Sequence, residues 1–446
     1  MKNAVSGVGL APDAAMVTFP IAMFLPGSDI APVRQRKREF YDGLTRWHSE
    51  FAQAAAESPL LSVEGANYEE ALNKANHLLL THLWGDGLPL WPATRERVDW
   101  ILQGTALPRT HVIGKFPPRG GVTTVETCAI ALGMAGGRPE YLPVLVAAVD
   151  ACLDPTTGFD QLQATSGGPF PVVIVNGPVA KQIRLNSGFG LLGPDPQRPA
   201  GASIGRALRL LQQNVGGALP GIGTMAIFGA MRYTNAVFAE DEAGLPEGWL
   251  PHATERHGFE PGSNSISLVF ASGVTNVRRR GAKKETPEED VQNGLWRMAD
   301  FMRTPNLAAL AGYEKGTPGV MMISPVVAQT MAGLGWTKPA IRQFLWENSK
   351  IPMAQMRRAG APAWIEIDAN PVTRESISLD PWPICLKPEN IVLVVAGGSH
   401  PTHSYWLQAH SPSVIGRPVR LPESFDRLLA DADRDLGCGS DACVIQ

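Results

Sequence analysis

Three short apolar runs in the second half of the chain constrain its fold more than any other feature. They occupy residues 265–271, 319–324 and 391–396, and their length and composition are typical of buried strands. The segments between them are predicted helices: 288–302, 326–334 and 338–348. Strands that alternate with helices favour a parallel sheet covered by helices. We therefore predict a parallel α/β layer in the C-terminal part.

Two apolar helices are predicted in the first part. Residues 124–135 and 139–152 are rich in Ala, Val and Leu on nearly every side, so both helices should be buried. Thr123 and Glu126 have the spacing of a capping box, which predicts that the first of these helices begins here. The same helices could equally bury against a second copy of the chain, so a homodimer is compatible with the sequence.

A mixed α/β class follows, with buried helices and short strands in the first part. A β-branched run at 172–175, ended by Asn176-Gly177-Pro178, predicts one of these strands. Helical spacing or helix signals also mark 34–57, 67–83, 93–103, 202–215 and 422–435. We find no internal repeat in the sequence.

Near residue 262 the sequence changes from a loop-rich stretch to alternating predicted strands and helices. This change suggests four segments. They are an N-terminal arm with helices (1–84), a glycine-rich core domain (85–262), an α/β domain (263–436) and a mobile tail that contains cysteines (437–446).

Charge and composition argue against several classes of protein. The net charge is −3, which argues against a nucleic-acid-binding protein. No window of 18 apolar residues occurs, so no membrane helix is expected. Five cysteines, an odd number, do not make a disulfide scaffold and favour a reduced cytoplasm. The chain lacks a Walker motif, and it lacks a GxGxxG that follows a strand and has an acidic residue about 20 positions further on. A standard dinucleotide fold is therefore disfavoured, and no cofactor is predicted, although a divalent metal is possible.

Glycine-rich polar stretches suggest a site for a small anion. They lie at 117–123, 136–140, 176–194 and 214–223, and glycine lets main-chain amides approach a ligand. Arg119, Arg138 and Arg206 each lie close to one of these stretches. A guanidinium group binds carboxylates bidentately. The alternative is that the stretches are simply tight turns.

Proton transfer is assigned to an acidic segment that also contains histidine. Glu240 and His252, with Arg256 nearby, provide groups that burial could tune toward neutral pH. A solvated acidic loop is the alternative.

Histidines and cysteines near the C-terminus allow metal or redox chemistry. His400, His403 and His410 follow the run that ends at Gly397-Gly398, and imidazoles bind divalent metals. They are alternatively polar site residues or structural residues. Cys438 and Cys443 could exchange electrons or hold a soft metal; the alternative is two exposed thiols without a role.

Several motifs resemble a largely uncharacterised bacterial family, over roughly residues 85–275. Its genes often neighbour small proteins with a Cys- or selenocysteine-Gly-Ser-Cys motif. The stretches that carry the resemblance are GDGLPLWPATRERVDWIL (85–102), PPRGGVTTVETCAIALGMAGGRPEYLPVLVAAVDA (117–151), VVIVNGP (172–178), LNSG (185–188), ASIGRALRLLQQNVGGALPG (202–221) and the segment 240–259. No reaction is carried over from the family.

The resemblance implies site residues and two departures. Where the family pattern has a Cys after the helix turn and a His before the strand, this chain has Gly137 and Gly167-Gly168. The site residues that the resemblance implies are Glu126, Arg138, Glu140, Asn176, Asn186, Ser187, Arg206, Asn214, His252 and Arg256.

Three functions are compatible with these observations. The first is an enzyme that acts on a small organic anion by elimination, hydration or hydrolysis, with Glu126, Glu240 or His252 moving a proton. Its binding residues would be Arg119, Arg138, Asn176, Asn186, Ser187, Arg206, Asn214 and Arg256. The second is a thiol-redox or soft-metal protein that uses Cys438 and Cys443, with a small Cys- or selenocysteine-containing partner. The third is a structural subunit of another enzyme.

Overall fold

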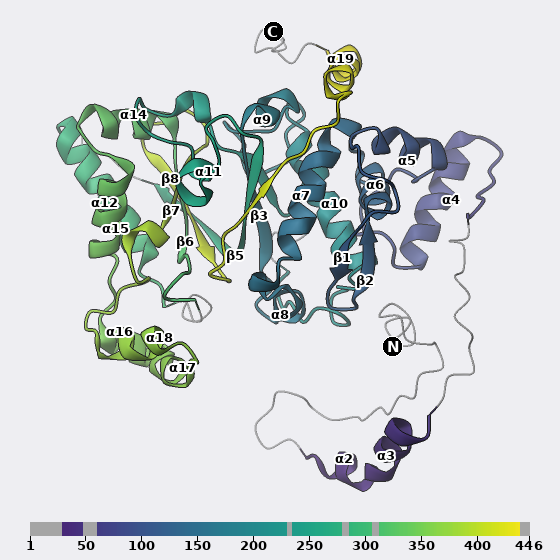
Figure 1. Cartoon of the computed structure of the whole chain (residues 1–446), viewed down its shortest axis with the longest axis horizontal. Helices are drawn as coiled ribbons and strands as arrows, with labels where there is room; N and C mark the ends of the chain where they lie inside the picture. The colour runs from purple at the N-terminus through teal and green to yellow at the C-terminus, as the bar shows by residue number, and fades with distance from the viewer. Residues whose placement is uncertain (1–28, 48–59, 230–233, 279–284, 306–311, 438–446) are drawn as a thin grey trace.

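A mixed seven-stranded sheet forms the centre of the computed structural model, which describes residues 29–47, 60–229, 234–278, 285–305 and 312–437 (Figure 1). The order along the sheet is β4-β3-β5-β8-β6-β7, and β9 pairs with β5. The strands are β3 (Phe170–Asn176), β4 (Ala236–Ala239), β5 (Ser265–Arg278), β6 (Gly319–Ile323), β7 (Val392–Val395), β8 (His403–Ala409) and β9 (Ile415–Pro418).

The mixed α/β class is confirmed, but the expected parallel C-terminal layer is parallel only in part. In that half, β6 and β7 run parallel, whereas β8 runs antiparallel to both β5 and β6. The prediction was wrong here because β8 was not expected, and its insertion between β5 and β6 separates strands that would otherwise have been neighbours. The sheet also crosses residue 262, since β3 and β5 are adjacent strands.

The two halves of the sheet repeat one topology. In each half the first strand, β3 or β6, has a parallel outer neighbour, β4 or β7, and an antiparallel inner neighbour, β5 or β8. The hydrogen bonds beyond the parallel pairs also correspond: Glu240 N donates to Val175 O, and Ala396 N donates to Ile323 O. The structure therefore contains a repeat that the sequence does not reveal.

The sheet curls until its two edge strands meet. Just beyond β4, Asp241 N donates to Val395 O of β7 at 2.8 Å. The segment 186–187 bridges the same junction, because Ala239 N donates to Asn186 O and Gly397 N donates to Ser187 O. The carboxyl ends of both outer strands are thus held together.

Apolar cores lie on both faces of the sheet. In β3, Val172 and Ile174 face the core inside the curl, and Val173 and Val175 face the helices outside. This alternation is what a strand buried on both faces requires. The outer face is covered in one half by α6 (Val125–Met134), α7 (Leu142–Cys152) and α10 (Ala200–Asn214), and in the other by α12 (Pro287–Met302), α14 (Pro325–Gly333) and α15 (Lys338–Asn348) (Figure 1).

The helix α6 begins one residue later than the capping pattern predicted. Its N-cap is Thr124, whose hydroxyl accepts from Thr127 N, while Thr127 Oγ1 accepts from Thr124 N. Threonine replaces the usual Glu at the third position, so Glu126 is not the capping partner. As predicted, α6 and α7 are buried.

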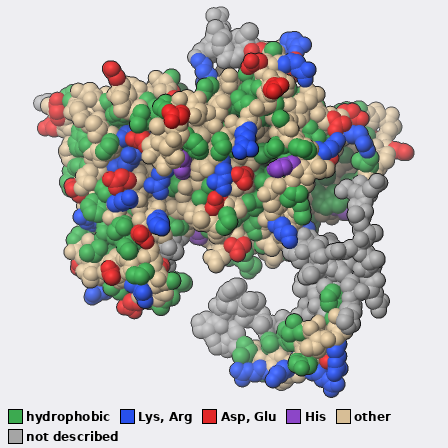
Figure 2. Space-filling model, viewed as in Figure 1, with side chains coloured by type: hydrophobic (Ala, Val, Ile, Leu, Met, Phe, Trp, Pro, Cys, Tyr) green, Lys and Arg blue, Asp and Glu red, His purple; other side chains and the backbone are tan. Residues whose placement is uncertain are grey.

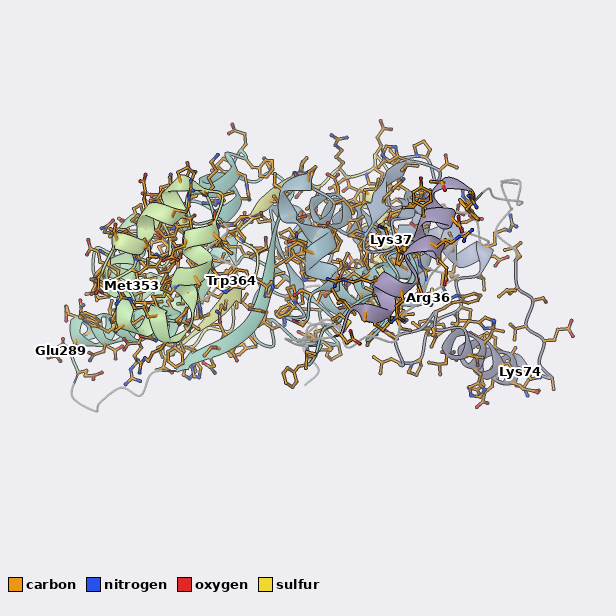
Figure 3. All side chains as sticks on the ribbon, turned by 90° about the horizontal axis from the view of Figure 1, so that it is seen from below. Arg36, Lys37, Lys74, Glu289, Met353 and Trp364 are labelled. Carbon is orange, nitrogen blue, oxygen red and sulfur yellow. The ribbon has the colours of Figure 1, made fainter. Side chains whose placement is uncertain are left out.

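An N-terminal arm projects from this body. It consists of α2 (Ala31–Gln35) and α3 (Lys37–Thr45), which contain no buried residue. Lys and Arg side chains lie along its lower side (Figure 2). Arg36 and Lys37 of the arm lie in the same half of the view as Lys74, and Met353 and Trp364 lie in the half of Glu289 (Figure 3).

The remaining elements complete the described chain. They are α4 (Tyr68–Thr81), α5 (Arg95–Leu102), β1 (Val112–Phe116), β2 (Gly121–Thr124), η1 (Pro139–Tyr141), η2 (Pro155–Thr157), α8 (Phe159–Ala164), α9 (Pro178–Gln182), η3 (Glu242–Gly244), α11 (His252–His257), α16 (Met353–Arg358), α17 (Ala361–Ile367), α18 (Pro371–Glu375), η4 (Ser376–Ser378), η5 (Pro388–Asn390) and α19 (Phe425–Leu436). None of the helices in these ranges combines the length and apolar character that crossing a bilayer requires.

Candidate ligand site

A cavity of about 530 Å³ lies at the carboxyl ends of β6 and β7. Its walls are the loop 188–194, the start of β8 and the turn that follows β7. The ends of strands in α/β sheets are common places for ligands, and this volume is within the usual range for a small-molecule site. The lining residues are Gly188, Phe189, Gly190, Leu191, Leu192, Gly193, Pro194, Met322, Ser324, Ala396, Gly397, Gly398, His400, His403, Ser404 and Tyr405.

Asn186 fixes the loop that forms one wall of the cavity. Its buried Oδ1 accepts from Gly188 N at 2.8 Å, and its Nδ2 donates to Phe189 O at 2.8 Å. The carbonyl oxygens of Asn186 and Ser187 meanwhile bind the ends of β4 and β7. Asn186 and Ser187, both predicted as binding residues, therefore lie beside the cavity and shape its loop.

Glycine allows the two sides of the cavity to approach each other. A Cβ atom on Gly398 would overlap the ring of Phe189, so only glycine lets this aromatic ring sit against the turn after β7. Within the described ranges, the main-chain N–H groups of Leu191, Leu192 and Gly398 donate to no protein acceptor. These three residues line the cavity, and their amides are not used within the described protein.

Two histidines and a threonine converge at the edge of the cavity. The Nδ1 atoms of His400 and His403 are 3.1 Å apart, and Thr402 Oγ1 is 3.0 Å from each. The imidazole rings are nearly perpendicular, at 84°. The turn at 401–402 brings His400 back over His403, the first residue of β8. His403 is therefore the first residue of a strand that the sequence did not predict.

A buried polar cluster lies behind the cavity, where β4 meets β7. Glu240 is fully buried and accepts hydrogen bonds from Asn176 Nδ2 at 2.7 Å and His252 N at 2.6 Å. The Nζ atom of Lys338 lies 3.6 Å from Glu240 Oε1. The structure thus brings together three predicted site residues, but none of them lines the cavity.

Burial shifts the pKa values in this cluster in opposite directions. Desolvation raises the pKa of Glu240 above its ordinary value, although the nearby Lys338 opposes the shift. Desolvation holds the pKa of His252 well below its ordinary value, and the neighbouring His257 adds to this effect. His252 is therefore a neutral imidazole at neutral pH. Its main-chain N–H, rather than its ring, contacts the junction of β4 and β7 through Glu240.

Lys338 is a cluster residue that sequence reasoning missed. Its ammonium group donates to Leu250 O at 2.6 Å and lies 3.2 Å from Glu255 Oε2. Arg342 pairs with the same carboxylate at 2.6 Å. The sequence signal was weak, because Lys338 looks like an ordinary first-turn residue of α15, and only the fold shows that it is 1% exposed.

The arginines expected to bind an anion are engaged by the protein itself. Arg138 pairs with Glu140 at 2.7 Å and with Asp435 of α19 at 2.9 Å. Arg206 binds both oxygens of Asp86, at 2.7 and 2.9 Å. Neither guanidinium lines the cavity, so the structure does not bring them into one shared cleft.

The other expected binding and catalytic residues also lie away from the cavity. Arg119 N donates to Gly216 O, and Asn214 Nδ2 donates to Trp84 O. Glu126 Oε1 accepts from Arg109 at 2.6 Å on the surface. Arg256 donates to the carbonyl oxygen of Glu389. These contacts connect segments of the fold.

The three C-terminal histidines do not form one group. His403 begins β8, and His410 follows its last residue. Seven strand residues span about 20 Å, which is too far for shared coordination. Cys438 and Cys443 lie outside the described residues, so the thiol hypothesis stays a prediction. Cys128 and Cys152 are buried in the apolar core, in the two helices that were expected to be buried.

Comparisons with known proteins add no further constraint. No protein-family model, curated protein or solved structure matches the chain with significance. The resemblance to the bacterial family therefore stays a prediction.

Proposed function

We propose that the protein is an enzyme that acts on a small organic anion in the cavity at the ends of β6 and β7. One observation carries the proposal: this cavity combines main-chain donors, apolar side chains and a pair of histidines. The few polar groups of a ligand site fix the orientation of the ligand, and the apolar walls contribute affinity.

The walls indicate what such a ligand contains. Leu191, Leu192 and Met322 offer an apolar surface for a carbon skeleton. The amides of the glycine-rich walls favour a carboxylate or phosphate at the other end, because main-chain N–H groups bind anions well. A volume of about 530 Å³ suits a ligand smaller than a dinucleotide.

The reaction classes remain those expected from the sequence: elimination, hydration or hydrolysis. Each needs a group beside the substrate that accepts a proton or polarises a bond. His400 and His403 line the cavity and can supply imidazole lone pairs for either purpose. They replace Glu126, Glu240 and His252 as the proposed reactive residues, since those three do not line the cavity.

A thermal-shift experiment tests whether this cavity binds anions. The full chain is melted with propionate, malate, benzoate and inorganic phosphate in the presence of EDTA. The Gly398→Val variant places a side chain against Phe189 in the mouth of the cavity. The Gly273→Val variant is the control, because a Cβ at Gly273 on β5 meets no atom within 4 Å.

We expect at least one of these anions to raise the melting temperature of the parent chain and of Gly273→Val. The same anion should have little effect on Gly398→Val. The proposal is contradicted if none of the four raises the melting temperature of the parent, or if Gly398→Val responds as the parent does.

A further inference from the structure

We infer that His400, Thr402 and His403 form a binding site for a first-row divalent metal ion at the edge of the cavity. The ligands would be His400 Nδ1, His403 Nδ1 and Thr402 Oγ1. The inference deepens the proposed function in one respect only, namely that the ion would face the proposed anion. Binding of the metal alone does not depend on that function.

The separations of the three atoms fit one face of an octahedron. They are 3.0, 3.0 and 3.1 Å. Two ligands that are each about 2.1 Å from a metal and about 90° apart are about 3.0 Å from each other. Tetrahedral ligands at the same distance would be about 3.4 Å apart. An ion bound to this triangle would keep its other coordination positions open.

Hydrogen bonds account for at most two of the three contacts in the triangle. An imidazole nitrogen carries either a hydrogen or a lone pair, never both, and the hydroxyl of Thr402 carries a single hydrogen. Thr402 N donates to His400 Nδ1 at 3.3 Å, which places a lone pair on that nitrogen. The three short contacts cannot all be well-formed hydrogen bonds at once. A cation accepts a lone pair from each of the three atoms once His400 Nδ1 releases its long 3.3 Å contact with Thr402 N.

The chemistry of the ligand set indicates the kind of ion and its role. Imidazoles favour ions such as Co²⁺, Ni²⁺ and Fe²⁺ over Mg²⁺ and Ca²⁺. No third His, Cys, Asp or Glu joins the pair within the ranges that the structure describes, so the ligands are neutral. The ion would keep both positive charges at the edge of the cavity. An anionic substrate would then neutralise the ion and complete its coordination.

Calorimetric titration with Co²⁺ tests the site without any knowledge of the substrate. The full chain carries Cys438→Ser and Cys443→Ser, because thiolates would otherwise bind the probe. We expect one ion per chain, an affinity lower by about tenfold or more in His400→Ala and in His403→Ala, and no change in His111→Ala, an exposed histidine elsewhere.

Two matched variants of Thr402 test whether its hydroxyl group binds the ion. Thr402→Ser keeps the oxygen and should bind Co²⁺ like the parent, whereas Thr402→Val keeps the shape and should bind several-fold more weakly. Circular dichroism verifies that each variant is folded. The inference is overturned if the parent binds no Co²⁺, or if both histidine variants bind it as the parent does.

The two proposals can fail separately. Co²⁺ binding that depends on His400 and His403, without any anion response, would retain the metal site and reject the proposed function. An anion response in EDTA that Gly398→Val abolishes, without Co²⁺ binding, would retain the proposed function and reject the metal site.

Discussion

At the scale of single residues, His257 is held in an environment that disfavours its protonation. Its Nε2 lies 3.1 Å from Ser267 Oγ, and its ring packs against Gly416. Burial, with the charges of Arg256 and Arg417, lowers the pKa of His257 to about 4. In the unfolded chain, the histidine side chain has a pKa of about 6.5. The contribution of His257 to the free energy of unfolding is therefore fully present above about pH 6.5, and it is lost as the pH falls through about 4.

The His257→Gln variant should lose less stability on acidification than the parent. Urea denaturation at pH 7 and pH 4.5 gives the two free energies of unfolding, and their difference should be smaller in the variant. His252 titrates in the same direction, so some loss remains. His111→Gln is the control and should behave as the parent. Equal losses in the parent and in His257→Gln would reject this explanation.

The ion pair between Lys338 and Glu240 gives a second residue-scale prediction. Both side chains are buried, so Lys338→Met leaves a carboxylate without a counter-charge. Breaking a buried pair in this way costs about 3 to 5 kcal/mol. Adding Glu240→Gln removes the uncompensated group and should restore much of the loss in urea denaturation. A double variant less stable than Lys338→Met would count against the pairing.

At the scale of elements, two glycines set the approach of α10 to the sheet. Gly201 and Gly205 lie one helical turn apart, and Cβ atoms there would overlap the carbonyl oxygens of Val237 and Thr234. Asn235 Nδ2 donates to Gly205 O at 2.9 Å across the same contact. The backbone of α10 can therefore pack directly on the segment that leads into β4.

Gly205→Ala should destabilise the protein by about 1 to 3 kcal/mol, because the added methyl group forces the helix away from its neighbour. Gly294→Ala is the matched control, since a Cβ on this α12 residue meets nothing within 4 Å. It should stabilise the protein by about 0.5 to 1 kcal/mol. Urea denaturation measures both effects, and similar values for the two variants would refute the close approach.

Sequence reasoning located most helices but missed several strands. The helix α10 was predicted because apolar residues such as Ile204 and Leu208 recur at helical spacing within one segment. The strand β4 has only four residues, and β8 mixes polar and aromatic side chains. Both depend on distant partners that periodicity does not show. The cavity was missed for the same reason, since it forms where the loop 188–194 meets the ends of β6 and β7 and the start of β8, all far along the chain.

At the scale of the whole molecule, one sheet connects both halves of the chain. The strand β5 pairs with β3 of the first half and β8 of the second, and the junction at Glu240 and Val395 joins the outer strands. We therefore expect a single cooperative unfolding transition in urea, followed in parallel by near- and far-ultraviolet circular dichroism. Two separated transitions, one for each half, would contradict this expectation.

The position of a bound anion tests the central claim most directly. Crystals of the full chain soaked with 3-bromopropionate report the ligand by the anomalous signal of bromine. We predict a bromine peak within the cavity, between Phe189 and Tyr405, with the carboxylate directed toward the glycine-rich walls or the histidine pair. A peak beside Arg138 or Arg206, or none in the cavity at concentrations that raise the melting temperature, would contradict the account.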